Sequence, residues 1–164
     1  MVFGLLTLDL NILMPKINFK IATPERVVFK DKVDLITLPT QEGEITVLYN
    51  HIPLIGVLRP GEIHVKKGNE EFSMAVSGGF IEVLAQKVVV LADTAERSEE
   101  IDIKRAQEAI ERANELRNQR ITDAKEFAAL TAQIEKELAR LKVGRKHNQR
   151  VNARSAEVNS TSKN

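Results

Sequence analysis

The chain contains no cysteine and no tryptophan, and Tyr49 is its single tyrosine. The absence of cysteine excludes disulfide bonds, thiolate metal sites and a thiol nucleophile, and it suits a reducing compartment. The shortage of tyrosine and tryptophan argues against nucleic-acid binding by base stacking. Because the formal net charge is +1, no overall field draws the chain to nucleic acid or to a membrane.

Signals of catalysis are also missing from the sequence. His51, His64 and His147 do not stand at metal-ligand spacing, and no pattern marks an activated nucleophile. Gly78 and Gly79 belong to no Walker-type or Rossmann-type loop, so we interpret them as a tight strand turn or a close backbone approach. We therefore expect no catalytic residue, no metal and no required cofactor.

The first residues, MVFGLLTLDLNIL, are apolar. They are too few to span a bilayer, and they lack the basic start and the small-residue cleavage site of a signal peptide. A second methionine, Met14, follows directly. We expect residues 1–15 to be a disordered leader or an over-extended start, with Met14 as the biological start.

Apolar and polar residues alternate from residue 16 to residue 97, as in INFKI at 17–21. Period two and many β-branched residues predict strands. Turn signals such as LPTQEGE, LRPGE and KKGNEE separate these strands. About eight to ten short strands at this spacing predict an antiparallel β-sandwich or barrel over residues 16–97.

The apolar spacing changes to three and four after residue 97, which is typical of amphipathic helices. Ile103 and Ala106 begin one apolar stripe, and Thr122 or Asp123 can cap a second helix. Each stripe is too narrow to bury enough surface alone. We therefore expect residues 98–143 to form an antiparallel two-helix hairpin.

Residues 144–164 lose the apolar stripe, and we expect them to be a basic tail that frays or is disordered. Residues 136–154 carry seven Lys or Arg against one acid, Glu137. Two explanations of this charge stay open. Cations suit a helix C-terminus because of the macrodipole, and the same run suits docking on an acidic partner surface.

A series of short motifs occupies residues 51–97. His-Ile-Pro-Leu is followed by Leu-Arg-Pro-Gly, then by Ser-Gly-Gly-Phe-Ile-Glu-Val, then by a valine-rich strand that ends in alanine. This order resembles the epsilon subunit of the F-type (proton-translocating) ATP synthase. The resemblance runs from about residue 16 to about residue 143 and is most specific between residues 51 and 106.

The resemblance implies a non-catalytic subunit of the central rotor stalk, peripheral to the cytoplasmic face of a bacterial inner membrane. The gamma subunit would hold its sandwich, which would rest on the ring of c subunits and couple ion flow to ATP synthesis. By position, Thr23 and His51 match residues that face gamma, and Gly43 and Glu44 match the turn that meets the ring. The hairpin of such subunits folds against the sandwich, or extends towards the catalytic alpha and beta subunits and brakes ATP hydrolysis.

The segment GEITVLYNH departs from the family pattern. Thr46 replaces a glycine, and Tyr49 and Asn50 replace Pro-Gly. Asparagine tolerates the left-handed backbone conformation better than most residues, so we expect the turn before His51 to survive. The shape of the gamma-facing edge near His51 stays open.

The segment AERSEEIDIKRA joins the two parts of the chain. Taken as residues alone, it predicts a helix start with surface ion pairs between Asp102 and Arg105 and between Glu100 and Lys104. Acidic residues are normal in a first helical turn. This interpretation needs no ligand.

The family resemblance adds a second interpretation of the same segment. Some bacterial epsilon subunits bind ATP through such a motif, and the matching residues here are Glu96, Asp102, Arg105 and Arg140. Two guanidinium groups can fork onto phosphate oxygens, and the carboxylates can accept hydrogen bonds from the adenine amino or ribose hydroxyl groups. ATP would then be a regulatory ligand rather than a required cofactor. A free-standing nucleotide-binding regulatory module is the alternative function.

Overall fold

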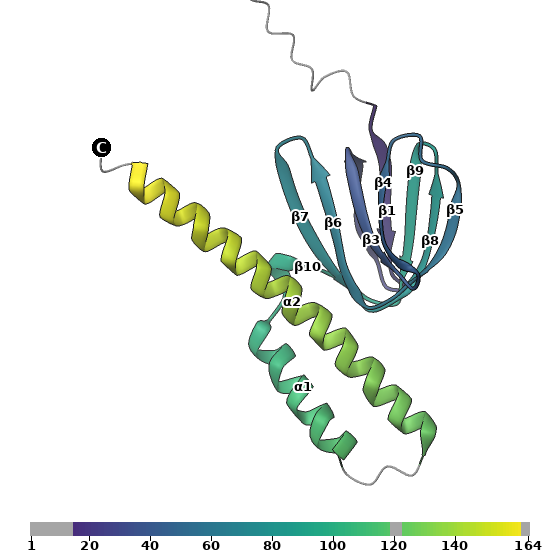
Figure 1. The fold of residues 1–164 in the computed structure, drawn as a ribbon, viewed down its shortest axis with the longest axis vertical. Helices are drawn as coiled ribbons and strands as arrows, with labels where there is room; N and C mark the ends of the chain where they lie inside the picture. The colour runs from purple at the N-terminus through teal and green to yellow at the C-terminus, as the bar shows by residue number, and fades with distance from the viewer. Residues whose placement is uncertain (1–14, 119–122, 162–164) are drawn as a thin grey trace, which may run out of the picture.

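The computed structural model describes residues 15–118 and 123–161 of the chain. Ten strands come first: β1 (Ile17–Ala22), β2 (Val27–Val33), β3 (Leu35–Thr40), β4 (Gly43–Leu48), β5 (Leu54–Leu58), β6 (Gly61–Lys67), β7 (Glu70–Val76), β8 (Gly79–Leu84), β9 (Lys87–Ala92) and β10 (Ala95–Arg97). A short 3-10 helix, η2 (Ser98–Glu100), and the helices α1 (Ile103–Asn118) and α2 (Ala124–Thr161) follow. Figure 1 shows the strands curled around one core, with α2 beside them. The predicted leader, residues 1–14, and Thr122 lie outside the described residues.

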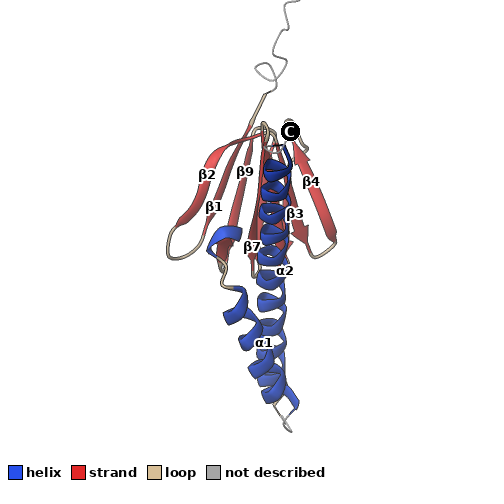
Figure 2. Cartoon of the chain, turned by 90° about the vertical axis from the view of Figure 1, so that its left-hand side faces the viewer, coloured by secondary structure: helices blue, strands red, loops and turns tan. Residues whose placement is uncertain are grey.

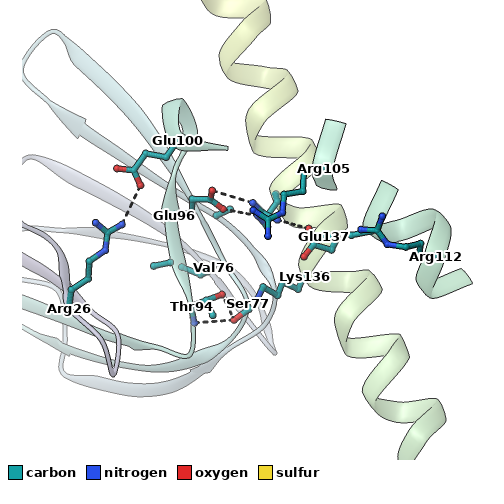
Figure 3. Close-up of a pocket in the computed structure, with 14 residues that line it drawn as sticks. Arg26, Val76, Ser77, Thr94, Glu96, Glu100, Arg105, Arg112, Lys136 and Glu137 are labelled. Atoms are coloured by element: carbon teal, nitrogen blue, oxygen red, sulfur yellow. Dashed lines mark hydrogen bonds and ion pairs between the residues drawn. The ribbon is translucent and has the colours of Figure 1, made fainter. Parts of the chain in front are cut away.

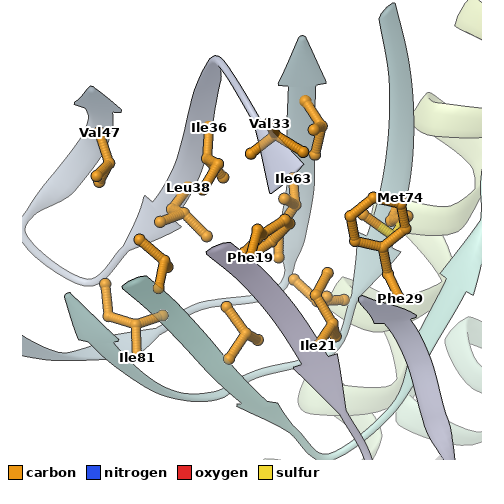
Figure 4. Packing of buried hydrophobic residues seen from close by; sticks show 14 of the residues in the cluster. Phe19, Ile21, Phe29, Val33, Ile36, Leu38, Val47, Ile63, Met74 and Ile81 are labelled. Carbon is orange, nitrogen blue, oxygen red and sulfur yellow. The ribbon is translucent and has the colours of Figure 1, made fainter. Parts of the chain in front are cut away.

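The strands enclose a hydrophobic core, as their alternating sequence predicts. Ile17, Phe19 and Ile21 point inwards and are at most 1% exposed, whereas Asn18 between them is exposed. Phe29 stands between two other rings, with its centroid 5.6 Å from Phe19 and 5.1 Å from Phe72, in tilted pairs. Figure 4 shows Phe19, Ile21 and Phe29 with their aliphatic neighbours in the space between the strands. This packing makes the strand domain a self-sufficient unit.

The sheet is mixed rather than purely antiparallel. Its strand order is β10-β7-β6-β3-β5-β8-β9-β1-β2, with β4 paired to β3. The predicted sandwich or barrel and the number of strands are confirmed, but β1 runs parallel to β9, with Phe19 opposite Val88. Period two shows which side chains face the core and is the same for both strand directions, so it could not reveal this parallel pair.

Three turn residues adopt the backbone that the sequence suggested. Asn50 has φ 64°, so the turn before His51 keeps a left-handed residue without a glycine there. Gly78 and Gly79 have φ 143° and 125°, and a Cβ on Gly79 would collide with the backbone of Leu91. The glycine pair is thus a close backbone approach, as predicted, and not a phosphate loop.

The helices form the predicted antiparallel hairpin, and each begins at an aspartate. The Asp102 carboxylate accepts a hydrogen bond from the backbone N–H of Arg105 at 3.0 Å. The Asp123 carboxylate accepts one from the backbone N–H of Lys125 at 2.8 Å. Small side chains line the contact between the helices, where Ala106 of α1 is fully buried. No helix in the described parts of the chain is long and apolar enough to cross a membrane.

Helix α2 is much longer than the sequence indicated. Residues 144–161, predicted to fray or to be disordered, continue the helix without a break. Gly144 is buried where α2 meets the start of α1, and a Cβ there would lie 3.0 Å from Ile103 Cγ1. The first turns of the extension contact the strand domain through Lys146 and Arg150, and the end of α2 projects beyond the strands (Figure 1 and Figure 2).

Candidate functional site

A cavity of about 540 Å³ lies where the strand domain meets both helices. Its lining combines the end of β7, strand β10, the turn after β1, helix η2, and one face each of α1 and α2. Arg26, Arg105, Arg112, Lys136 and Arg140 supply positive charge, and Glu96, Glu100 and Glu137 supply negative charge. Figure 3 shows these side chains converging from the strand domain and from both helices. We call this space the junction cavity.

Arg140 lies at the centre of the polar contacts in the junction cavity. Its Nε and Nη2 donate to the two carboxylate oxygens of Glu96 at 2.7 and 3.2 Å, and its Nη1 donates to Glu137 at 2.7 Å. The hydrogen bond to Glu96 raises the pKa of Arg140, burial opposes this, and the bond to Glu137 adds to the rise. The side chain of Arg140 is 18% exposed. Because Glu96 belongs to β10, this fork joins α2 to the strand domain.

Arg105 and Lys136 make no ion pair with any of the residues that the structure describes. Arg105 comes from the first turn of α1, and Lys136 stands one turn before Arg140 on α2. Two further arginines are engaged weakly: Arg112 contacts Glu108 at 3.8 Å, and Arg26 contacts Glu100 at 3.4 Å. The cavity therefore presents cations whose charge is not fully balanced, which suits a polyanionic ligand.

Three of the four predicted nucleotide-binding residues line the junction cavity. Glu96, Arg105 and Arg140 face it, whereas Asp102 does not line it and instead caps α1. The expected side-chain pair between Asp102 and Arg105 is wrong, because the carboxylate bonds to the backbone of Arg105. The expected pair between Glu100 and Lys104 is also wrong. Glu100 lies in η2, outside α1, and points to Arg26.

Sequence reasoning missed three cationic residues of the cavity. Arg112 follows Arg105 by seven residues, and Lys136 precedes Arg140 by four, so helix periodicity places each pair on one face. That signal was available in the sequence. Arg26 lies in the turn after β1, and no local pattern links this turn to the helices.

The four predicted partner-facing residues occupy the two ends of the strand domain. Thr23 closes the turn between β1 and β2, where its hydroxyl accepts from the Arg26 N–H at 3.3 Å. Gly43, with φ 132°, and the exposed Glu44 follow the turn after β3. The sheet register places Thr23 and Gly43 at one end. His51, whose Nδ1 lies 2.7 Å from the Ile52 carbonyl, stands at the other end.

An apolar face lies on the outside of β5, β8 and β9, near the Thr23 end of the strand domain. Ile55 is 78% exposed, Phe80 60% and Leu91 58%. Val57 stands opposite Phe80, and Phe80 stands opposite Leu91, so their side chains form a row across three strands. Exposed apolar residues in a continuous row are typical of a protein–protein contact. We call this row the outer face.

Comparisons with known proteins agree with this architecture. Residues 16–98 match the family model for the ATP synthase delta/epsilon chain, β-sandwich domain. The chain is 45% identical over 133 residues to an ATP synthase epsilon chain of Dehalococcoides mccartyi, covering 81% of this chain and 95% of that one. It is 43% identical over 131 residues to the one of Chloroflexus aggregans, covering 80% and 94%.

Two solved structures share the fold of this chain at lower sequence identity. A chain of the Euglena gracilis mitochondrial ATP synthase, in a structure of OSCP, F1 and the c-ring, superimposes with a TM-score of 0.65 at 26% identity, over 73% of this chain and 76% of that one. A chain of the Tetrahymena thermophila mitochondrial ATP synthase central stalk and c-ring shares the fold, with a TM-score of 0.55 at 16% identity, over 80% and 98%. The strand domain with its appended hairpin and the matches over most of the sequence establish that the chain belongs to the ATP synthase epsilon family.

Proposed function

We propose that the chain is a non-catalytic rotor subunit, held in the central stalk by the gamma subunit along the outer face. The observation that carries this proposal is the exposed apolar row across β5, β8 and β9, which lies beside the turn at Thr23. Covering such an exposed apolar surface with a partner protein is favourable, because the apolar side chains are then removed from water. Gly43 and Glu44 at the Thr23 end then meet the ring of c subunits, so that rotation of the ring is transmitted to gamma. The two sequence relatives, from Dehalococcoides mccartyi and Chloroflexus aggregans, are bacterial, which supports a place at the cytoplasmic face of the inner membrane.

Binding to gamma is tested by exchanging one aromatic side chain of the outer face. Phe80→Asp places a charge in the middle of the contact, and we expect it to abolish co-purification of gamma. Phe127→Asp is the matched control, because Phe127 is 50% exposed on α2 and lies away from the outer face. Undiminished recovery of gamma with Phe80→Asp would contradict this docking site.

The hairpin supplies the regulatory part of the proposed function. Folded against the strand domain, it leaves the catalytic alpha and beta subunits free, and extended it brakes ATP hydrolysis. Deletion of residues 98–164 should therefore raise ATP hydrolysis by the assembled enzyme while assembly continues. Unchanged hydrolysis after this deletion would remove the regulatory role. The isolated chain should show no ATP turnover.

We further propose that the junction cavity binds ATP as a regulatory ligand. Arg105 and Lys136 supply cations for the phosphate oxygens, and Arg112 stands on the same face of α1 as Arg105. Glu96 and Arg140 already form a planar fork, which can rearrange to meet ribose and phosphate groups. The cavity needs β10, α1 and α2 together, so ATP favours the folded hairpin through its higher affinity for that state.

Calorimetric titration of ATP, and separately of ADP, tests this proposal. We expect a dissociation constant between about 1 μM and 1 mM, which corresponds to roughly −8 to −4 kcal/mol. Arg105→Ala and Arg140→Ala should each abolish the heat signal. Arg145→Ala is the matched control, because Arg145 lies on α2 outside the cavity and contacts Gln107. A flat titration of the unaltered chain up to several millimolar ATP would contradict the site.

A further inference from the structure

Helix α2 continues beyond the point where α1 can support it. α1 begins at Ile103, which faces Gly144, and Arg145 still contacts Gln107 of α1 at 3.5 Å, so the residues of α2 after Arg145 run past the start of α1. An isolated helical extension of this length is marginal in water. The extension lies along β6, β7 and η2 instead (Figure 2), and these contacts give it support.

The central contact of this extension is an ion pair to a half-buried carboxylate. Lys146 Nζ donates to Glu62 Oε1 of β6 at 2.7 Å, and the hydroxyl of Ser73 donates to the same oxygen at 2.6 Å. The Glu62 side chain is 11% exposed. A carboxylate so well shielded from water depends on its hydrogen-bond partners, because losing one leaves its charge poorly solvated.

Two further contacts lie on the same side of α2. His147 Nδ1 lies 3.3 Å from the hydroxyl of Ser98, a residue of η2 that is 5% exposed. Arg150 lies 3.9 Å from the carboxylate of Glu71 on β7. Position 150 follows position 146 by four residues and position 147 by three, so one side of the helix makes all of these contacts.

Gly144 allows α2 to reach this position. It is buried, and a Cβ there would lie 3.0 Å from Ile103 Cγ1 and 3.1 Å from Ile101 Cγ2, both closer than ordinary contact. The missing side chain lets α2 approach the start of α1 and continue onto the strand domain. Glycine usually weakens a helix interior, so its presence here points to a packing requirement.

We infer that residues 144–151 of α2 form a clasp that holds the hairpin closed on the strand domain without any nucleotide. The clasp lies beyond the junction cavity, and none of its residues lines that cavity. It ties α2 to β6 and β7, whereas the Glu96–Arg140 fork ties α2 to β10. The closed state is therefore the resting state of the chain, and ATP adds to its stability rather than creating it. The clasp requires no ATP binding at the junction cavity.

Hydrogen exchange measured by mass spectrometry, without nucleotide, tests the clasp. We expect the amides of residues 144–151 to be protected in the unaltered chain. Lys146→Gln should raise their exchange rate about tenfold, since a charge-assisted hydrogen bond to a shielded carboxylate is lost. Lys142→Gln is the matched control: it removes the same charge one turn earlier on α2, where Lys142 is exposed and has no ion pair among the described residues.

Exchanging the charges of Lys146 and Glu62 shows whether loss of their ion pair, rather than a general effect of the substitution on α2, opens the clasp. Lys146→Glu alone should open the clasp further, because it places a third carboxylate near Glu62 and Glu71. Adding Glu62→Lys should restore protection of residues 144–151. The amides of β8 and β9 in the same experiment report whether the strand domain is folded.

Two results would overturn the clasp. One is exchange in Lys146→Gln at the rate of the unaltered chain. The other is protection of residues 144–151 that develops in the unaltered chain after ATP is added and is absent before. The first experiment contains no nucleotide, so a failure of ATP binding leaves its result unaffected and the two proposals stay distinguishable.

Discussion

The strand domain and the hairpin are stabilised by different forces. The strand domain encloses large apolar side chains, and Phe19, Ile36 and Met74 are at most 1% exposed. The hairpin meets the strand domain through charged groups, above all the Glu96–Arg140 fork and the Glu62–Lys146 pair. Apolar packing resists separation under almost all solution conditions, whereas ion pairs respond to charge, salt and pH. The comparison indicates a strand domain with its own apolar core and a hairpin contact that depends on charge.

The largest effect should come from the core of the strand domain. Phe19→Ala removes a ring that packs on Phe29, and we expect a loss of about 3–5 kcal/mol in the free energy of unfolding. Urea denaturation followed by circular dichroism measures this loss. A change below about 1 kcal/mol would contradict the view that this core, rather than the hairpin contact, stabilises the domain.

The next effect should be confined to the hairpin. Arg140→Met keeps the volume of the side chain but leaves the carboxylates of Glu96 and Glu137 without their partner. We expect the hairpin to open more readily by roughly 2 kcal/mol, while the strand domain keeps its stability. Hydrogen exchange of the α2 amides measures the opening of the hairpin, and exchange of the β8 and β9 amides measures the stability of the strand domain. Equal loss of protection in strands and helices would show that the two regions are one cooperative unit.

A smaller effect is expected where α2 meets the start of α1. Gly144→Val inserts a branched side chain at a point where even a Cβ approaches Ile103 and Ile101 too closely. We expect it to weaken the docking of residues 144–151 by about 1 kcal/mol or slightly more, the low end of the range for overpacking. Gly144→Ala compares two opposing effects, because alanine has a higher helix propensity than glycine but its Cβ approaches Ile103 and Ile101. Greater protection of these amides in Gly144→Val would contradict the tight approach.

The smallest effect concerns pH and two groups beneath the clasp. Burial by itself raises the pKa of Glu62, but hydrogen bonds from Lys146 and Ser73 outweigh burial and hold the pKa below its ordinary value. Burial lowers the pKa of His64, and the charges of Arg150 and Lys146 lower it further, against the opposing charge of Glu71.

The lowered pKa values of Glu62 and His64 affect the stability of the closed hairpin in the same direction. The closed form binds fewer protons than an opened form in which the two groups regain ordinary pKa values, 6.5 for His64 and 4.5 for Glu62. Closure is therefore fully favoured above pH 6.5, weakens as His64 protonates below that value, and weakens again as Glu62 protonates below 4.5. Hydrogen exchange of residues 144–151, corrected for intrinsic rates, should show this loss between pH 7 and pH 4. A flat profile would exclude these two groups as determinants of closure.

Local patterns in the sequence determined the strands, the start of each helix and the family. Alternation placed Ile17 and Phe19 in the core, and the aspartates at 102 and 123 marked the helix starts, because these signals depend on neighbouring residues alone. The order of motifs between residues 51 and 106 was enough to indicate the family. Of the four residues that the resemblance suggested for ATP binding, Glu96, Arg105 and Arg140 line the junction cavity.

The tertiary structure decided the features that depend on residues far apart in the chain. The parallel pairing of β1 with β9 and the approach of Arg26 to Glu100 follow from long-range packing. Residues 144–161 lack an apolar stripe, and charged contacts of Lys146 and Arg150 with β6 and β7 support the first turns of this part of α2. A local pattern contains no information about such partners, because the ion pair between Glu62 and Lys146 joins residues that only the folded domain brings together.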